Sequence, residues 1–468
     1  MILFSAGVAA LFSFLCWHVG AVEQFADVQV ELLLCLLVVL NLGPMLAELI
    51  CKRCDPFDPK HLFLAYYFLI FTFSSLCEIK FGFVRDGLAA GTLDITTRVR
   101  ALSAIVLGLA SYIIGCYIPI GQKLANIIPN LWDYSATRGK IVAYIGITAG
   151  LIAFYILMKT SGGIAIFLEN LGSWRTVGVL EGVGYLTFPI SIVLPASALF
   201  LLLLTLSADS RQITWSVICV LVIAILSVLP VFILGFRITL VPIIIQYLMV
   251  WHYQRKRFSL IILITIGLSV TAALTIFTNM RSQVSVLSSE GIGAALLFRT
   301  PGLATVERVV YRMDRGEPNR GIKSGIVEAM TILIPRAIWP RKPQTVGLEF
   351  ADIFFYDYFI GRGDPIDGIK SGVSSTIIGE TIWISGIAYV TFSLLVLGIF
   401  TKTANIWYVK SCRTKQKLFV YALLTSQLPV FVEAPQNALN TYMMIGSMCV
   451  VMLGASLTCK HKQNNNAY

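Results

Sequence analysis

Long runs of apolar residues, separated by short polar segments, make up most of the chain. An α-helix of about 17–25 apolar residues is long enough to cross a bilayer. Runs of this kind predict about twelve transmembrane helices, near residues 2–22, 30–50, 62–84, 101–120, 141–158, 185–206, 213–234, 238–251, 259–279, 376–400, 418–432 and 440–458. The pattern therefore predicts an all-α polytopic membrane protein, in which the eighth and eleventh helices are short.

Two longer polar segments interrupt these runs and divide the chain into three parts. Residues 1–279 carry the first nine predicted helices and, at 159–184, the smaller polar segment. Residues 280–375 form the larger segment, and residues 376–468 carry the last three predicted helices and a cytoplasmic tail. We therefore expect one large helical loop outside the membrane rather than a separate soluble domain.

The larger segment has a helical pattern of its own. A Thr-Pro pair at Pro301 is typical of a helix start, and apolar residues then recur at helical spacing to about Arg315, opposite Glu307. We expect this amphipathic helix to lie on the membrane surface or over a cavity. A second helix is predicted over Ile326–Ile334. A third, over Leu348–Ile360, is rich in aromatic residues suited to the membrane interface.

Lysine and arginine residues gather in alternate short loops, and this asymmetry predicts the orientation of the chain. If Met1 is cytoplasmic, the loops that hold Lys60, Lys140 and Lys402 are cytoplasmic too. The first outer loop then contains Glu23 and no cation. Long outer loops can carry cations because they cross the membrane regardless of charge. Both termini are therefore predicted to be cytoplasmic.

The composition excludes a soluble multidomain protein. The 468 residues are 57% hydrophobic and only 13% charged, with a mean hydropathy of +0.80. The formal net charge of +11 would suit a nucleic-acid partner, but most cations lie in short loops between apolar runs. Membrane topology and anionic lipid explain such cations better, so we expect membrane lipids and no nucleic acid as partners.

Neither the cysteines nor the histidines predict a metal site or a cofactor. Six of the ten cysteines lie within apolar runs, where they behave as small hydrophobic residues: Cys16, Cys35, Cys77, Cys116, Cys219 and Cys449. Cys51 and Cys54 have the CxxC spacing of a redox or metal pair, but no second CxxC or histidine cluster follows. An ordinary structural role is the alternative that we favour for this pair, and we expect no disulfide framework.

The segment Ile334–Pro343, with the sequence IPRAIWPRKP, is the first candidate for chemistry. Its prolines and charges are incompatible with a membrane-spanning helix. Arg336, Arg341 and Lys342 have no acid between them, and the planar fork of arginine suits phosphate oxygens. The segment therefore predicts either a diphosphate clamp or a set of solvated or headgroup-binding cations.

Three further charged residues lie in apolar surroundings. Arg237 stands between the seventh and eighth predicted helices, where an arginine is costly unless it faces a wet cavity or a partner; a snorkelling helix-end arginine is the alternative. Glu433 and Glu380 are acids predicted at the outer face. Either could be a general base or the ion partner that orients an arginine, and a structural ion pair is the simpler alternative.

Two motifs together resemble a known family. Ile334–Pro343 is followed after a gap by Gly372–Gly379, with the sequence GVSSTIIG, and then by a new apolar run. This pair resembles the bacterial oligosaccharide repeat-unit polymerases, the Wzy-type O-antigen polymerase group, which includes the enterobacterial common antigen polymerase. The Gly-x-Arg that ends at Arg237 and the Ser161–Gly163 start of the smaller outer segment look like the same family.

The resemblance implies a GT-C-like, metal-independent membrane glycosyltransferase. Such an enzyme polymerises oligosaccharide repeat units into O-antigen, common antigen, capsule or exopolysaccharide. Donor and acceptor would both be linked to undecaprenyl diphosphate, and a chain-length regulator and a flippase are the expected protein partners. The implied location is the bacterial cytoplasmic (inner) membrane, with the active site facing the periplasm.

Site roles follow from this expected chemistry. We predict that Arg237, Arg336 and Arg341, supported by Lys342, bind the leaving diphosphate. Either Glu433 or Glu380 would then be the catalytic base or its orienting partner. Four residues of the outer segments are expected to bind substrate: Arg175, Trp339, Arg281 and Arg299.

Two other functions fit parts of the same pattern. A lipid-linked oligosaccharide flippase or other secondary carrier would tend to have short outer loops and paired halves, whereas this chain has one large outer loop and no evident repeat. An O-antigen ligase would share the fold and differ in its acceptor. Related ligases often use a histidine in the outer loop, and residues 253–460 contain none.

Overall fold

In the computed structural model of the protein, the described part of the chain is helical. The model describes residues 2–22, 25–51, 54–81, 94–128, 135–163, 184–206, 215–234, 237–255, 302–331, 346–361, 374–410 and 414–456, with isolated positions at 257–269, 334 and 339. Every regular element in these ranges is a helix. The predicted all-α class is therefore confirmed for the described residues.

Eight of the described helices are long and apolar enough to cross a membrane, as expected of a polytopic membrane protein. They are Ile2–Val19, Ala26–Ile50, Pro59–Lys80, Ile95–Tyr117, Ala136–Thr160, Trp215–Ile233, Ile387–Val409 and Pro435–Ala455. The apolar helix Pro189–Thr205 is slightly shorter. The chain is thus embedded in a membrane, while the predicted total of about twelve spans remains a prediction because the run at 259–279 lies mostly outside the described residues.

Two predicted spans are interrupted in the structure. The run at 376–400 forms a short helix, α17 (Ile377–Ser385), and a long one, α18 (Ile387–Lys410). They are separated by Gly386 at φ +75°, a backbone conformation that favours glycine. The run at 418–432 forms α19 (Lys415–Thr425) and α20 (Leu428–Glu433), because a turn separates the two helices and a proline opens the second. Uninterrupted helices were the wrong prediction at both places.

The chain forms two compact units. Unit 1 contains Met1–Ile127, Leu260–Trp407 and Gln427–Thr441. Its described helices are α1 (Ile2–Val19), α2 (Ala26–Ile50), α3 (Pro59–Tyr67), the π-helix η2 (Phe68–Phe73), α4 (Ser74–Phe81), α5 (Ile95–Tyr117), α6 (Ile120–Ile127), α14 (Gly302–Asp314), α15 (Ile322–Thr331), α16 (Val346–Gly361), α17, most of α18, α20 and the start of α21 (Pro435–Ser456).

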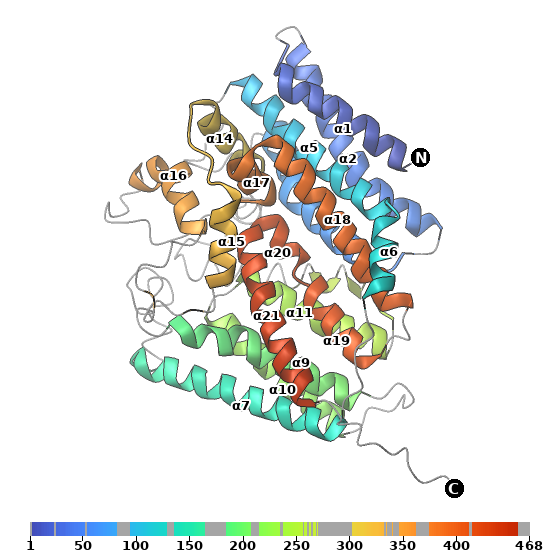
Figure 1. Cartoon of the computed structure of the whole chain (residues 1–468), viewed down its shortest axis with the longest axis vertical. Helices are drawn as coiled ribbons and strands as arrows, with labels where there is room; N and C mark the ends of the chain where they lie inside the picture. Colours follow the sequence, from blue (N-terminus) through green and yellow to red (C-terminus); the bar gives the residue numbers. More distant parts are fainter. Residues whose placement is uncertain are drawn as a thin grey trace. The chain divides into compact units, whose positions relative to one another are not determined.

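Helix α5 is the centre of unit 1. Seventeen of its 23 residues are buried, and it packs against α1, α2 and α14 (Figure 1). Gly115 on α5 and Gly398 on α18 allow these two backbones to meet. A Cβ added at Gly115 would lie 2.2 Å from the carbonyl oxygen of Leu395, and one at Gly398 would lie 2.2 Å from that of Tyr112. Only glycine fits this crossing, because both neighbouring atoms belong to backbone.

The large outer segment forms the three predicted helices, with one correction to their packing. Helices α14 and α16 lie close to their predicted positions, whereas α15 spans Ile322–Thr331 rather than Ile326–Ile334. Helix α14 is mostly buried up to Val310, and only its last turn is more exposed. Glu307 is fully buried, and its Oε1 accepts a hydrogen bond from Arg98 Nε of α5 at 2.8 Å. The ion pair satisfies the charge that the sequence pattern alone assigned to an exposed face.

Unit 2 contains Ile128–Ser259, Tyr408–Ser426 and Tyr442–Tyr468. Its described helices are α7 (Ala136–Thr160), η4 (Gly184–Leu186), η5 (Pro189–Val193), α9 (Leu194–Thr205), α10 (Trp215–Ile233), α11 (Arg237–Gln254), α19 and the remainder of α21. Helix α9 packs against α7 and α10. Within this unit Tyr247 Oη donates to the carbonyl of Pro195 at 2.9 Å, which satisfies buried polar groups between α11 and α9.

Candidate functional site

The site lies at the start of α17, where residues 374–376 lead into the helix. Thr376 caps α17, because its side chain accepts a hydrogen bond from the N–H of Gly379 at 3.2 Å. Its φ of +53° is uncommon for a residue with a branched side chain. The N–H of Thr376 and Oγ of Ser374 both donate to the main-chain carbonyl of Glu433, at 2.9 and 2.5 Å. The start of α17 and the end of α20 are therefore joined.

Glu380, in the first turn of α17, is a buried carboxyl group surrounded by donors. The residue is 2% exposed. Ser375 Oγ donates to its Oε2 at 2.5 Å, and the main-chain N–H of Gln436 on α21 also donates to the carboxylate. Burial raises the pKa of Glu380 to about 7, against the smaller effects of the Ser375 hydrogen bond and the charge of Arg320. A carboxyl group that is partly ionised near neutral pH can accept a proton from a reacting hydroxyl.

Glu433, the last residue of α20, lies beside this segment and is less buried. Its main-chain carbonyl makes the bonds to residues 374 and 376, while its carboxylate accepts a hydrogen bond from Tyr66 Oη of α3 at 3.2 Å. The two acids singled out from the sequence, Glu380 and Glu433, thus come from separate parts of the chain to one place. Their surroundings differ, since only Glu380 is fully enclosed.

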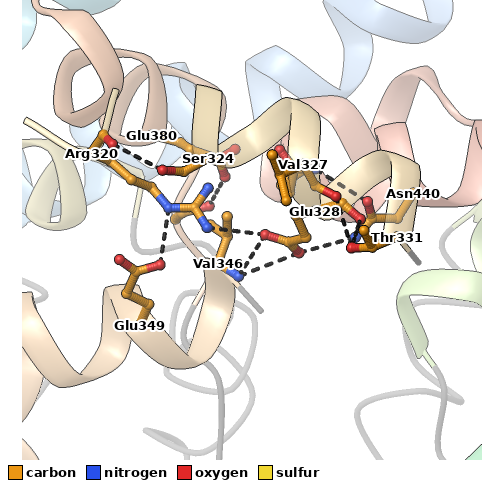
Figure 2. A network of polar contacts seen from close by, with 11 residues as sticks. Arg320, Ser324, Val327, Glu328, Thr331, Val346, Glu349, Glu380 and Asn440 are labelled. Carbon is orange, nitrogen blue, oxygen red and sulfur yellow. Dashed lines mark hydrogen bonds and ion pairs between the residues drawn. The ribbon is translucent and has the colours of Figure 1, made fainter. Parts of the chain in front are cut away.

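Arg320 is the cation of the site, and the sequence did not point to it. Figure 2 shows its guanidinium between two carboxylates: Nε donates to Glu349 Oε2 at 3.0 Å, and Nη2 donates to Glu328 Oε2 at 3.1 Å. The Arg320 side chain is 3% exposed, and its guanidinium carbon lies 5.4 Å from the ring centre of Trp383 on α17. An arginine this deeply buried needs such partners.

Glu328 connects Arg320 to two further helices. It is 2% exposed and accepts hydrogen bonds from the N–H of Val346 at the start of α16 and from Asn440 Nδ2 on α21, the latter at 3.2 Å (Figure 2). Gln436 Nε2 donates in turn to Asn440 Oδ1 at 3.2 Å. The network therefore ties α15, α16 and the start of α21 to the segment that carries Arg320.

Two buried donors of this network have no acceptor within the described part of the chain. They are Nη1 of Arg320 and Nε1 of Trp383. A buried donor without an acceptor costs about 1–3 kcal/mol, and more when it is charged. Both donors could bind oxygen atoms of a substrate.

The net charge of the cluster decides which substrate group suits it. Among the described residues of the cluster, Arg320 is the cation, whereas Glu328, Glu349 and Glu380 are acids. In this described part of the cluster, the carboxylates outnumber the guanidinium, and they still do when Glu380 is protonated. It suits neutral hydroxyl groups better than phosphate.

Most of the predicted cationic site residues lie outside the described residues. They are Arg175, Arg281, Arg299, Arg336, Arg341 and Lys342. Arg237 begins α11, but its side chain is not among those described. Trp339 is described only as a partly exposed side chain, 38% accessible. The proposed convergence of the arginines on a diphosphate therefore stays a prediction, and so do the roles of the two acids, whose chain segments are joined through the main-chain carbonyl of Glu433.

The residues that sequence reasoning missed are Arg320, Glu328 and Asn440. Glu328 gave one usable signal, because it is the single charged residue in the apolar stretch 325–335. A lone acid in an apolar helix must find a partner when that helix is buried. Arg320 and Asn440 lie in polar sequence and gave no signal of this kind.

His61 lies beside an acid and a thiol in the structure. His61 stands alone in the sequence, yet its Nε2 lies 3.0 Å from Glu48 Oε2 and its Nδ1 lies 3.9 Å from Cys54 Sγ. Even so, the described residues include no group of three or more His, Cys, Asp or Glu side chains that could hold a metal ion. Cys51 and Cys54 are both free thiols.

Comparison of the chain with known protein families, with curated proteins and with solved structures found no match.

Proposed function

We propose that this chain is a membrane glycosyltransferase that polymerises lipid-linked oligosaccharide repeat units, with Glu380 as its catalytic base. The observation that supports the proposal most is the enclosure of Glu380. It is a buried carboxyl group with a pKa raised to about 7 by burial, at the end of the Gly372–Gly379 motif and joined to the segment of Glu433. General-base catalysis is most effective when the pKa of the base lies near the working pH.

The proposed reaction is one glycosyl transfer. A hydroxyl oxygen of the acceptor repeat unit forms a bond to the anomeric carbon of the donor, and the bond from that carbon to the diphosphate oxygen breaks. The hydroxyl proton passes to the Glu380 carboxylate, and the lipid diphosphate leaves with the bonding electrons. Glu433 and Tyr66, which are hydrogen-bonded to each other, would orient the acceptor beside Glu380.

The charges around Arg320 lead us to propose separate binding regions for the acceptor hydroxyl and for the diphosphate. The acceptor hydroxyl belongs with Glu380, Glu328 and Glu349, because the described side chains of this region include more acids than cations. The diphosphate needs cations, for which we propose the predicted set of Arg237, Arg336, Arg341 and Lys342. Each charge-assisted contact to the leaving group would contribute about 1.5–3 kcal/mol.

The remaining parts of the proposal concern the cellular setting. Donor and acceptor are undecaprenyl-diphosphate-linked oligosaccharides, and the product is O-antigen, common antigen, capsule or exopolysaccharide. The enzyme resides in the bacterial inner membrane with both termini in the cytoplasm and the active site in the periplasm. A flippase would supply the repeat units and a chain-length regulator would set the length of the product.

Complementation of a deletion strain tests this function. Cells that carry Glu380→Gln should make only the product with one repeat unit, whereas wild-type protein restores the full ladder of the surface glycan on a gel. Asp352→Asn, an exposed acid on α16, is the matched control and should restore the ladder. Membrane levels of each variant are compared on an immunoblot.

The pattern of the ladder also separates the alternatives. A deletion strain that still attaches one repeat unit has lost a polymerase, while a strain that attaches none has lost a ligase or a flippase. A full-length ladder from well-expressed Glu380→Gln protein would rule out Glu380 as the base.

A further inference from the structure

Arg320 is anchored at the C-terminal end of α17, one helical turn beyond Glu380. The N–H of Arg320 donates to the carbonyl of Trp383 at 3.0 Å, and the N–H of Gly321 donates to that of Ile384 at 3.2 Å. Trp383 and Ile384 follow Glu380 by three and four residues, which places them one helical turn further along the same face. The chain segment of Arg320 therefore lies beside Glu380.

Glu328 approaches Glu380 from a different element. It accepts a hydrogen bond from Asn440, and Asn440 accepts one from Gln436, which stands one turn earlier on α21. The main-chain N–H of that same Gln436 donates to the Glu380 carboxylate. The Arg320–Glu328 ion pair is 3.1 Å long and buried at both ends. It therefore links the end of α17, to which Arg320 is bonded, with α21, to which Glu328 is bonded.

We infer that Arg320 and Glu328 are positioning residues, which bring a cation and an anion of opposite effect to α17, the helix that carries Glu380. The part of this inference that concerns catalysis rests on the proposed function. The part that concerns the ionisation of Glu380 does not, because it follows from the packing of α15, α17 and α21 alone.

Among the described residues, the charged and titratable groups around Glu380 come from the segment before α15 and from α15, α16 and α18, while Glu433 of α20 is joined to residues 374–376 through its main-chain carbonyl. Arg320 favours the ionised form of Glu380, whereas Glu328 on α15 opposes it. Tyr389 on α18 interacts electrostatically with Glu380. Glu349 on α16 acts on Glu380 only through Arg320, because it accepts a hydrogen bond from the guanidinium.

Because Arg320 and Glu328 carry opposite charges, removing one or the other should shift the pKa of Glu380 in opposite directions. Removing the charge of Arg320 should raise the pKa of Glu380, since the carboxylate loses a cation and Glu328 loses its partner. Removing the charge of Glu328 should lower the pKa of Glu380, since a neighbouring anion disappears and Arg320 becomes free to act on Glu380. Two residues with merely structural roles would both loosen the site and would move the pKa in one direction.

Infrared titration of the purified full-length protein in nonionic detergent provides the test. The band of protonated Glu380 is identified as the carboxyl absorption that is lost in Glu380→Gln, and its midpoint is followed from pH 4.5 to 9. Arg320→Gln should raise the midpoint by about 1 pH unit, and Glu328→Gln should lower it by about as much. Arg320→Lys should stay near the wild-type value, and Asp352→Asn should not move it.

Two shifts in the same direction, or no shift in either variant, would overturn the inference. If Arg320→Gln does not fold, Glu328→Asp gives the independent reading: it keeps the charge and should stay near the wild-type midpoint, whereas loosening of the site would shift it together with Glu328→Gln. Failure of the proposed function is recognised separately: the opposite shifts would appear as expected while Glu380→Gln still built full-length polymer in cells. Polymer loss in Glu380→Gln without the opposite shifts would instead reject the positioning roles alone.

Discussion

The enclosure of Glu380 makes the stability of this protein depend on pH, and Glu380→Gln should remove that dependence. The carboxyl group has a pKa of about 7 in the folded protein, and burial is the main cause. In the unfolded chain its pKa is the ordinary 4.5. Between these two values the folded protein binds more protons than the unfolded chain, so the free energy of unfolding falls as pH rises through this window.

The size of the effect follows from the difference of the two pKa values. About 2.5 pH units at about 1.4 kcal/mol each correspond to roughly 3 kcal/mol of stability, present below pH 4.5 and lost above pH 7. Glutamine keeps the shape of the side chain and stays neutral at every pH. The variant should therefore equal the wild type near pH 4.5 and exceed it by up to this amount at pH 8.

Urea unfolding in nonionic detergent, followed by tryptophan fluorescence at several pH values, measures this difference. The informative quantity is the wild type minus Glu380→Gln, since other groups that titrate contribute equally to both proteins. A difference that does not change between pH 4.5 and pH 8 would show that Glu380 has an ordinary pKa. The physical basis for its role as a base near neutral pH would then be lost.

Two other substitutions test the packing of unit 1. Gly398→Val should lower the free energy of unfolding by about 1–3 kcal/mol, because the added side chain meets backbone at the α5–α18 crossing; combined with Gly115→Ala it should cost less than the sum, since one separation of the helices relieves both clashes. Gly446→Ala, which has open space around it, is the control and should be neutral or slightly stabilising in the same unfolding assay. Arg98→Met should cost about 3 kcal/mol at pH 7.5, because it leaves Glu307 buried without its cation. Burial raises the pKa of Glu307, so the loss should shrink at pH 5; an equal loss at both pH values would contradict the role of this ion pair.

The membrane-spanning helices were predictable because their signal is local. A run of apolar residues long enough to cross a bilayer needs no knowledge of its neighbours, and eight such helices occur in the described residues. The starts of α14 and α16 were also close to their predicted positions. The break at Gly386 was missed because a glycine does not disturb the pattern of apolar residues. It interrupts the helix through its backbone conformation, with φ at +75°.

The candidate site, too, could be predicted from the sequence only in part. Glu380 and Glu433 could be singled out from the sequence, because a carboxyl group in apolar surroundings is unusual wherever it occurs. Their meeting, and the choice of Arg320 as the cation beside them, could not be predicted. The bonds that join residues 374–376 to Glu433 and Glu328 to Asn440 link residues about 60 and 112 positions apart, and no sequence pattern specifies such pairs.

The sequence by itself determined that this chain is helical and embedded in a membrane, and it supplied two acids in apolar surroundings as candidates for chemistry. Only the tertiary structure decided that Glu307 is an internal ion-pair partner rather than a surface charge, and that Glu380 rather than Glu433 is the enclosed carboxyl group. The reason is physical. Hydrophobic length and helical period are properties of neighbouring residues, whereas proton affinity depends on burial and on charges that arrive from distant segments.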